Sequence, residues 1–387
     1  MDVGIGILDL NDYCLQRILH YVDIKGQISF AQTCARFRDV FHVWSRCEYS
    51  YVSIVGDVEP RELTLLSLVA SSVRKLNIFA DDLVSSFNDN YTDKKHHNVV
   101  SKFCNLIRSM DCLKSIKLWQ VSPHPIVKHI LRALRDLPRL RKLYLCIPMR
   151  ITIDLSRSYR LNLFWTPRDL LRHCRSLCNL RTLHLSDDVS SSNLRDIVKQ
   201  MPHLKDLSFY IDRSNKWSLF LCHQDTRNHL TRIFDFLASK RRLEVLRIKG
   251  EINADNEAKS LANIKTLKSL DCSFANPNFV IYLTELTSLR SLRITSLHGM
   301  DISATYLQVI RSCKDLKFLR IFDYNISPNF VSLAGKVLEE IESENTLHLR
   351  VHGRHSSHSL KEFKSNALDH KNLLFRSITA TELLTLI

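Results

Sequence analysis

The sequence predicts a right-handed α/β solenoid in which each repeat contributes one short strand and one helix, preceded by a small three-helix segment. The first observation behind this prediction is a six-residue pattern of apolar, two variable, apolar, one variable and apolar residues, which occurs nine times. The second is that helical patterns lie between consecutive copies. The nine copies begin at Val73, Leu113, Leu140, Leu180, Leu204, Leu243, Leu267, Leu289 and Leu316.

Each copy has the pattern of a short strand that follows a tight turn. The second and third apolar residues alternate with one variable residue, so they lie on the same face of a strand. The first apolar residue is expected to close the turn that leads into the strand. Since no single copy can bury its apolar face alone, neighbouring copies must stack and share one continuous core.

The copies resemble those of the leucine-rich repeat family. Five of the eight steps between copies are 22 to 27 residues long, near the period of that family, and the other three are 39 or 40 residues. The resemblance implies one strand and one helix in each turn of the solenoid. We therefore predict three parts: a helical domain over residues 1–50, the repeat solenoid over 51–350 and a C-terminal cap over 351–387.

Strands are expected at both ends of the repeats, over 49–54 and 346–351. Helices are expected over 63–72, 99–110, 126–137, 169–177, 194–201, 230–238, 306–313 and 330–341. The three long steps contain 87–97, 151–164 and 217–221, which should form a polar loop, a hairpin and a strand-like segment. Such insertions either help to bind a partner or have no role in binding.

The first 47 residues do not follow the repeat. Leu15, Ile18, Leu19 and Val22 share one face of a predicted helix that Asn11 or Asp12 can cap. The segment 23–26 should break this helix, with Gly26 in a turn. A second short helix contains Ile28, Ala31 and Cys34, and a third has the apolar stripe Phe37, Val40, Phe41 and Trp44. Three such helices are expected to gain most of their stability by docking onto another surface.

Residues 10–44 resemble an F-box. The resemblance is carried by Leu10–Val22, by Ile28–Arg38 and by Trp44, and Asn11 stands where the family usually has proline. In that family the motif binds the Skp adaptor of a cullin ubiquitin ligase. The resemblance therefore implies adaptor contacts from Leu10, Asn11, Leu15, Ile18, Leu19 and Ile28. The structural alternative is a helical cap that seals the first repeat.

The face of the sheet that the repeat helices do not cover is the expected site for a target. Large aromatic residues lie beside lysine and arginine there, and these residue types are enriched at binding hot spots. The predicted target-binding residues are Lys117, Trp119, Tyr144, Arg247, Arg293, Phe318, Arg320 and Phe322. In addition, the position after the first apolar residue is basic in eight of the nine copies, with Glu244 as the exception. That column could attract an acidic or phosphorylated peptide or a nucleic acid, or it could be only a solvated surface.

The composition narrows the choice of function further. The net charge of +15 favours an acidic partner, although a solvated surface is again the simpler interpretation. The eleven cysteines are odd in number and irregularly spaced, so we expect most of them to be reduced core residues. The sequence has no apolar run long enough to span a bilayer, which predicts an intracellular protein of the cytoplasm or nucleus.

No cofactor or metal is expected. His173, Cys174, Cys178 and His184 lie near one another in sequence, but no second pair has the spacing of zinc ligands. The three histidines at 352, 355 and 358 are more typical of a polar turn than of a metal site. The sequence also has no phosphate-binding glycine loop, nucleophile elbow or metalloprotease motif, so no enzyme activity is expected.

Together these patterns favour a substrate-recognition subunit of a Skp–cullin–F-box ubiquitin ligase. Its partners would be the Skp adaptor, through it a cullin, and an acidic or phosphorylated protein target. The alternative is a ligase-independent scaffold or a nucleic-acid-binding repeat protein, which the positive charge suggests.

Overall fold

The computed structural model describes residues 6–55, 59–79, 94–119, 125–135, 137–146, 177, 179–188, 191–211, 229–296, 299–323, 325–327, 329–352 and 372–377. The chain divides into two compact units. The first unit comprises residues 1–186 with 200–202, and the second unit comprises residues 187–199 and 203–387. Each unit combines parallel strands with helices, as the repeat pattern predicts.

The first unit begins with the short 3-10 helix η1 (Ile7–Asp9), which is followed by the three predicted helices. They are α1 (Asp12–Leu19), α2 (Ile24–Thr33) and α3 (Ala35–Glu48). Asn11 caps α1, since its side chain accepts a hydrogen bond of 2.9 Å from the backbone N–H of Cys14. Asp23 caps α2 in the same way, through a bond of 2.8 Å from the N–H of Gly26.

Gly26 does not lie in a loop between helices, which corrects the sequence prediction. It is the third residue of α2, because the helix capped by Asp23 already begins at Ile24. A Cβ atom at this position would come within 2.2 Å of Cγ1 of Val22. Close packing against the end of the preceding segment therefore accounts for the glycine.

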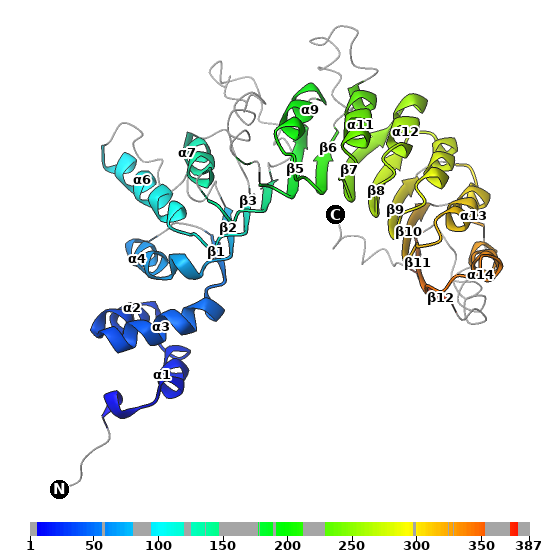
Figure 1. Cartoon of the computed structure of the whole chain (residues 1–387). Coiled ribbons are helices and arrows are strands. Elements are labelled where there is room, and N and C mark those ends of the chain that lie inside the picture. The colour runs from blue at the N-terminus through cyan, green and yellow to red at the C-terminus, as the bar shows by residue number, and fades with distance from the viewer. Residues whose placement is uncertain are drawn as a thin grey trace. The chain divides into compact units, whose positions relative to one another are not determined.

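The repeats of the first unit form a parallel sheet in the order β1-β2-β3-β4-β5. Helices cover one face of these strands (Figure 1). The strands are β1 (Tyr51–Ile54), β2 (Lys75–Phe79), β3 (Ser115–Trp119), β4 (Lys142–Cys146) and β5 (Thr182–Asp188). The helices between them are α4 (Pro60–Val69), η2 (Ala70–Ser72), α6 (Lys94–Arg108) and α7 (Pro125–Leu134).

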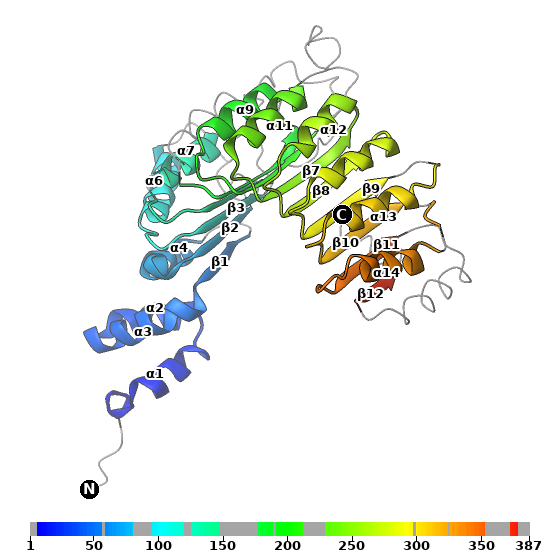
Figure 2. The same ribbon diagram turned by 45° about the vertical axis from the view of Figure 1, so that its right-hand side comes forward.

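The second unit repeats this plan, with parallel strands in the order β6 to β12. Its strands are β6 (Asp206–Tyr210), β7 (Val245–Ile252), β8 (Ser269–Phe274), β9 (Ser291–Ser296), β10 (Phe318–Asp323), β11 (Leu347–His352) and β12 (Leu373–Ser377). Its helices are α9 (Ser191–Lys199), α11 (His229–Lys240), α12 (Asp255–Ala262), η4 (Pro277–Glu285), α13 (Ser303–Ser312) and α14 (Phe330–Glu340). Figure 2 shows α13 and α14 on one side of strands β9 to β11.

The repeated apolar residues form the core of both units. The first residue of every copy, from Val73 to Leu316, is at most 5% exposed, and so are the two strand residues of every copy. Backbone hydrogen bonds of 2.8 Å join the turns before neighbouring strands. For example, the N–H of Lys114 donates to the carbonyl oxygen of Arg74, and the N–H of Arg141 donates to that of Lys114. Each buried leucine or isoleucine contributes about 1.5–3 kcal/mol. The architecture is therefore an α/β leucine-rich repeat solenoid.

Three elements differ from the prediction or were missed. Helix α12 was not predicted because it has few large apolar residues; Glu257 supports its first turn by accepting bonds of 3.3 Å from the N–H groups of Asn253 and Ala254. The 3-10 helix η4 was also missed. Strand β12 lies in the predicted cap but pairs in parallel with β11, so it adds a strand to the sheet.

Several predicted segments lie outside the described residues. These are the hairpin over 151–164, the segment 217–221, the part of the 87–97 loop before α6, nearly all of the predicted helix over 169–177, and most of the cap. The histidine and cysteine positions 173, 174, 178, 355 and 358 are also outside. Within the described ranges, no group of three or more His, Cys, Asp and Glu side chains is placed to hold a metal ion. In the same ranges, no helix has the length and apolar character needed to cross a membrane.

The cysteines of the described residues should differ widely in reactivity. Cys47 is exposed, whereas Cys104, Cys272 and Cys313 are buried. Burial raises the pKa of the Cys104 and Cys272 thiols and raises the pKa of Cys313 to about 12. We expect iodoacetamide at pH 8 to alkylate Cys47 at least about 100-fold faster than Cys313, because the thiolate is the reactive form. Peptide mass spectrometry would measure each site, and urea should abolish the difference; equal rates in the folded chain would contradict the burial.

Candidate functional site

The face of each sheet that the helices leave uncovered is here called the open face. Along each strand, the residue between the two buried apolar positions points to this face. In the first unit the open face has a row of four residues in register on β2 to β5: Asn77, Lys117, Tyr144 and His184. Polar and aromatic side chains from distant parts of the sequence are thus brought side by side.

The open face of the first unit contains an aromatic patch made of Phe79, Trp119, Tyr144 and His184. The rings of Phe79 and Trp119 are stacked with their centroids 5.8 Å apart, and those of Tyr144 and His184 are also 5.8 Å apart. The Lys117 Nζ atom lies 3.6 Å from the centroid of the Trp119 ring, a cation–π contact. Three predicted target-binding residues, Lys117, Trp119 and Tyr144, therefore lie together on neighbouring strands.

The open face of the second unit contains an arginine row. Arg247, Asp271, Arg293, Arg320 and Arg350 occupy equivalent positions on β7 to β11 and are paired in register. The prediction that Arg293 and Arg320 lie on neighbouring strands is confirmed by their pairing. The sequence argument missed Arg350, although the strand that contains it was predicted. Aligning that strand with the nine copies would have placed Arg350 next to Arg320.

The arginine row lines a depression of about 370 Å³. Four arginines and one carboxylate, that of Asp271, contribute to its wall. An Nη1 atom of Arg293 lies 3.6 Å from Asp271, and that of Arg247 donates a hydrogen bond of 2.8 Å to Asp206. Burial raises the pKa of the Asp271 carboxyl, although the neighbouring arginines act in the opposite direction.

The two predicted phenylalanines have different roles. Phe318 is 52% exposed on the wall of the depression, and its ring stacks on His348 with a centroid distance of 4.9 Å. Phe322 is only 6% exposed, and the guanidinium carbon of Arg293 lies 5.0 Å from its ring centroid. This corrects the prediction that Phe322 is a contact residue. Its buried ring instead packs against the Arg293 guanidinium group.

The basic column beside the strands is interrupted where the sequence has Glu244. Its carboxylate accepts bonds of 2.5 Å from Lys205 and 3.0 Å from Lys268, and these bonds lower the pKa of the Glu244 carboxyl. The part of the column that flanks the arginine row consists of the exposed residues Arg290 and Lys317. Positive charge is thus concentrated beside β9 and β10.

The N-terminal helices place the predicted adaptor-binding residues in two groups. Leu10, Ile18 and Ile28 are partly exposed, and Asn11 is exposed. Leu15 and Leu19 are fully buried at 0% exposure, which corrects their prediction as direct contact residues. Both lie on the face of α1 that packs inward, so they hold the helices together.

Arg36, on α3, was not singled out from the sequence but organises the segment before α1. Its guanidinium donates bonds of 2.6 Å to the carbonyl oxygens of Leu8 and Leu10 and of 2.9 Å to the Asp12 carboxylate. These bonds fix a segment whose side chains Ile7 and Leu8 are 51% and 62% exposed. The helices were predicted from regularly spaced apolar residues. A single arginine that binds backbone carbonyl oxygens leaves no such pattern, so Arg36 was not identified.

The three helices are also joined to the first repeat. Ser45 of α3 and Ser72 of η2 are buried and their hydroxyl oxygens lie 2.9 Å apart. Trp44 donates a bond of 3.3 Å to His20, and Tyr49 donates one of 2.5 Å to Gln27, beside a depression of about 270 Å³ next to β1. The helices therefore cover the end of the repeats on one side, as the cap alternative predicts, while other apolar side chains stay exposed.

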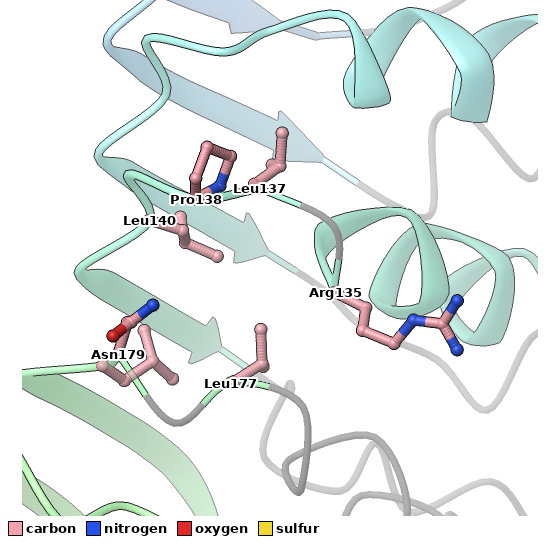
Figure 3. A pocket seen from close by; sticks show the side chains of 7 residues that line it. Arg135, Leu137, Pro138, Leu140, Leu177 and Asn179 are labelled. Carbon is pink, nitrogen blue, oxygen red and sulfur yellow. The ribbon is translucent and has the colours of Figure 1, made fainter.

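A small cavity of about 80 Å³ lies between the turns that precede β4 and β5 (Figure 3). Its walls are mainly buried leucines of the repeat, including Leu137, Leu140 and Leu177. Figure 3 shows the Arg135 side chain pointing away from these leucines. The volume suits a few water molecules rather than an organic substrate, so this cavity is a gap in repeat packing.

The chain was also compared with known proteins. No protein-family model matches it, and no curated protein matches its sequence. Among solved structures it is similar to an internalin C2 from Listeria monocytogenes, with 12% identity and a TM-score of 0.27 over 81% of this chain and 84% of that one. It is also similar to the protein in a TLR13–ssRNA13 complex, with 12% identity and a TM-score of 0.31 over 85% of this chain and 38% of that one.

A third similarity is to the leucine-rich repeat ectodomain of the Arabidopsis receptor kinase HAESA, solved with a peptide hormone ligand. Its identity is 14% and its TM-score 0.31, over 65% of this chain and 40% of that one. The chain thus spans less than half of the second and third of these chains. The repeat architecture stated here depends on the strand register and the buried repeat positions of the chain itself.

Proposed function

We propose that this chain is the target-recognition subunit of a Skp–cullin–F-box ubiquitin ligase. In this proposal the N-terminal helices bind the Skp adaptor, and the open faces of the repeats bind the protein to be ubiquitinated. The chain performs no chemistry. It accelerates ubiquitin transfer by holding a lysine of the target near the transferring enzyme, which raises their effective concentration.

The observation that carries the proposal is the exposed apolar surface of the N-terminal helices. Twelve large apolar side chains are exposed in the described part of the chain, and five of them belong to residues 7–43. They are Ile7, Leu8, Tyr13, Tyr21 and Val43, with exposed fractions between 51% and 79%. An apolar surface of this kind on a small helical domain is typical of a protein interface.

The sequence supports the same assignment, because residues 10–44 resemble an F-box and form three short helices. The helix with Leu15 and Leu19 is capped by Asn11, and α3 buries Phe37, Val40, Phe41 and Trp44. The second support is the position of this domain directly before a repeat solenoid. A solenoid offers an extended surface for a macromolecular partner, which suits target binding.

Adaptor binding tests the proposal directly. We expect the purified chain to bind purified Skp adaptor with a micromolar or tighter Kd, measured by calorimetry. Ile18→Asp should raise this Kd at least about tenfold, because a partly buried apolar contact is replaced by a charge that the interface must desolvate. Leu8→Asp, at a residue that is 62% exposed, should weaken binding with no effect on folding.

Ile281→Asp is the matched control, because Ile281 is a similar exposed isoleucine on η4 of the second unit. It should leave the Kd unchanged. A folded chain that does not bind the adaptor at micromolar concentrations would overturn the proposal. That outcome would favour a ligase-independent scaffold or a nucleic-acid-binding protein, which an RNA or DNA binding assay would then distinguish.

A further inference from the structure

We propose that the depression lined by Arg293, Arg320 and Arg350 binds a phosphorylated side chain of a target peptide. This inference deepens the proposed function, since it takes the ligand to be a segment of the ubiquitination target. The expected ligand group is a phosphate monoester rather than the carboxylate of an acidic residue. Three features favour it: the charge of the depression, the spacing of its arginines and the exposed ring beside them.

The wall of the depression is predominantly positive. Four arginines line it together with one carboxylate, that of Asp271, while Asp206 pairs with Arg247 from outside the lining. Such a wall favours the more highly charged of two anions. A phosphate monoester carries about −1.5 to −2 charges at neutral pH, whereas a carboxylate carries only one.

The spacing of the arginines also favours phosphate. Arg293, Arg320 and Arg350 are in register on three adjacent strands, which lie about 4.8 Å apart. Guanidinium groups from neighbouring strands can each donate two bonds to different oxygens of one tetrahedral phosphate. A carboxylate has only two oxygens, and a single arginine can satisfy both.

Arg293 is held in place before any ligand binds. The Arg293 guanidinium rests over the buried Phe322 ring at 5.0 Å and is oriented by Asp271 at 3.6 Å. The position of this side chain is therefore fixed before binding, which lowers the entropy lost on binding.

A peptide suits this depression better than a nucleic acid. The uninterrupted arginines begin at β9, because Asp271 occupies the equivalent position on β8. The register continues the row to Arg376 on β12, so from β9 to β12 the row spans only about 14 Å, which is short for a polynucleotide track. On the same wall Phe318 is 52% exposed and stacked on His348, which provides an apolar surface for a side chain next to the phosphorylated residue.

The test uses the purified chain alone and three degenerate peptide libraries centred on phosphoserine, serine or glutamate. Fluorescence anisotropy should show binding of the phosphoserine library at least about tenfold tighter than that of the glutamate library. Arg320→Glu with Arg350→Glu should weaken phosphopeptide binding at least about 100-fold. Arg320→Lys with Arg350→Lys should lose at least about tenfold, because lysine keeps the charge but cannot form bidentate bonds.

The matched control is Lys314→Glu with Lys336→Glu. Both lysines are exposed, one just after α13 and the other in α14, and the change in net charge equals that of the arginine-to-glutamate pair. This control should bind the phosphoserine library normally. Circular dichroism would verify that each variant is folded.

Four outcomes would overturn the inference. They are undetectable phosphopeptide binding, equal binding of the phosphoserine and serine libraries, an equal loss in the lysine control, or tighter binding of an oligouridine RNA that displaces the phosphopeptide. Because the adaptor is not present in this assay, failure here leaves the adaptor result intact. Conversely, phosphopeptide binding by a chain that does not bind the adaptor would retain this site and remove the ligase assignment.

Discussion

Replacing Leu15 with aspartate should unfold the N-terminal helices and abolish adaptor binding, while the strands of the second unit stay folded. Leu15 is fully buried, and its helix α1 packs on α3, whose inward face is formed by Phe37, Val40 and Phe41. A carboxylate in this position would be desolvated among the apolar side chains of α3. We expect a loss of more than about 4 kcal/mol in the stability of these helices, since unpaired buried charges are among the most destabilising substitutions.

Hydrogen exchange followed by mass spectrometry would measure this effect for each element. Fast exchange is expected in α1, α2 and α3, with unchanged exchange in β9 to β11. Tyr13→Asp provides the control on the same helix, because Tyr13 is 72% exposed and its replacement should leave exchange unchanged. Normal protection of α1 in the Leu15 variant would show that this side chain is not in the core. Faster exchange that spreads into α4 and β2 would indicate that the helices also stabilise the first repeats.

The fold was largely predictable because the repeat determines burial through a simple period. The strand residues alternate by two, and the helices between them follow from the need to return the chain to the same edge. The prediction was less complete where apolar periodicity is weak. Helix α12 depends on Ala258, Leu261 and Ala262 together with the bonds of Glu257, and η4 has a 3-10 period. Neither presents the apolar pattern of the longer helices.

The candidate site was predictable only in part, because periodicity identifies the face of a residue but not its depth. The sequence placed Arg293 and Arg320 on one face, and their register pairing follows from the repeat. It could not show that Phe322 lies under Arg293 or that Leu15 and Leu19 are buried, since these depend on neighbouring side chains. The pairing of Asp271 with Arg293, which alters the charge available to a ligand, likewise requires three-dimensional neighbours.

Gly250 has a special role in the strand that begins the arginine row. Its φ angle is +109°, a conformation that residues with a side chain rarely adopt. It lies in β7 within the register shift between Arg247 and Glu251, where β7 pairs with β8. The chain approaches closely here, because Ile211 donates a backbone hydrogen bond of 2.7 Å to Lys249. A bulge of this kind changes the direction of a strand and interrupts its regular pairing, which resumes at Glu251.

Gly250→Ala should therefore destabilise the second unit by at least about 2–3 kcal/mol. The backbone conformation alone costs about 1–3 kcal/mol for a residue with a Cβ atom. That atom would also lie 2.3 Å from the carbonyl oxygen of Ile211, so the backbone must shift and the bond between Ile211 and Lys249 must weaken.

Urea unfolding would give the change in free energy, with Gly299→Ala as the control because a Cβ there meets no atom within 4 Å. The control should stay within about 0.5 kcal/mol of the parent chain. Equal stability of the two variants would show that β7 can adopt a regular conformation at Gly250. A large difference would show that this bulge stabilises the second unit.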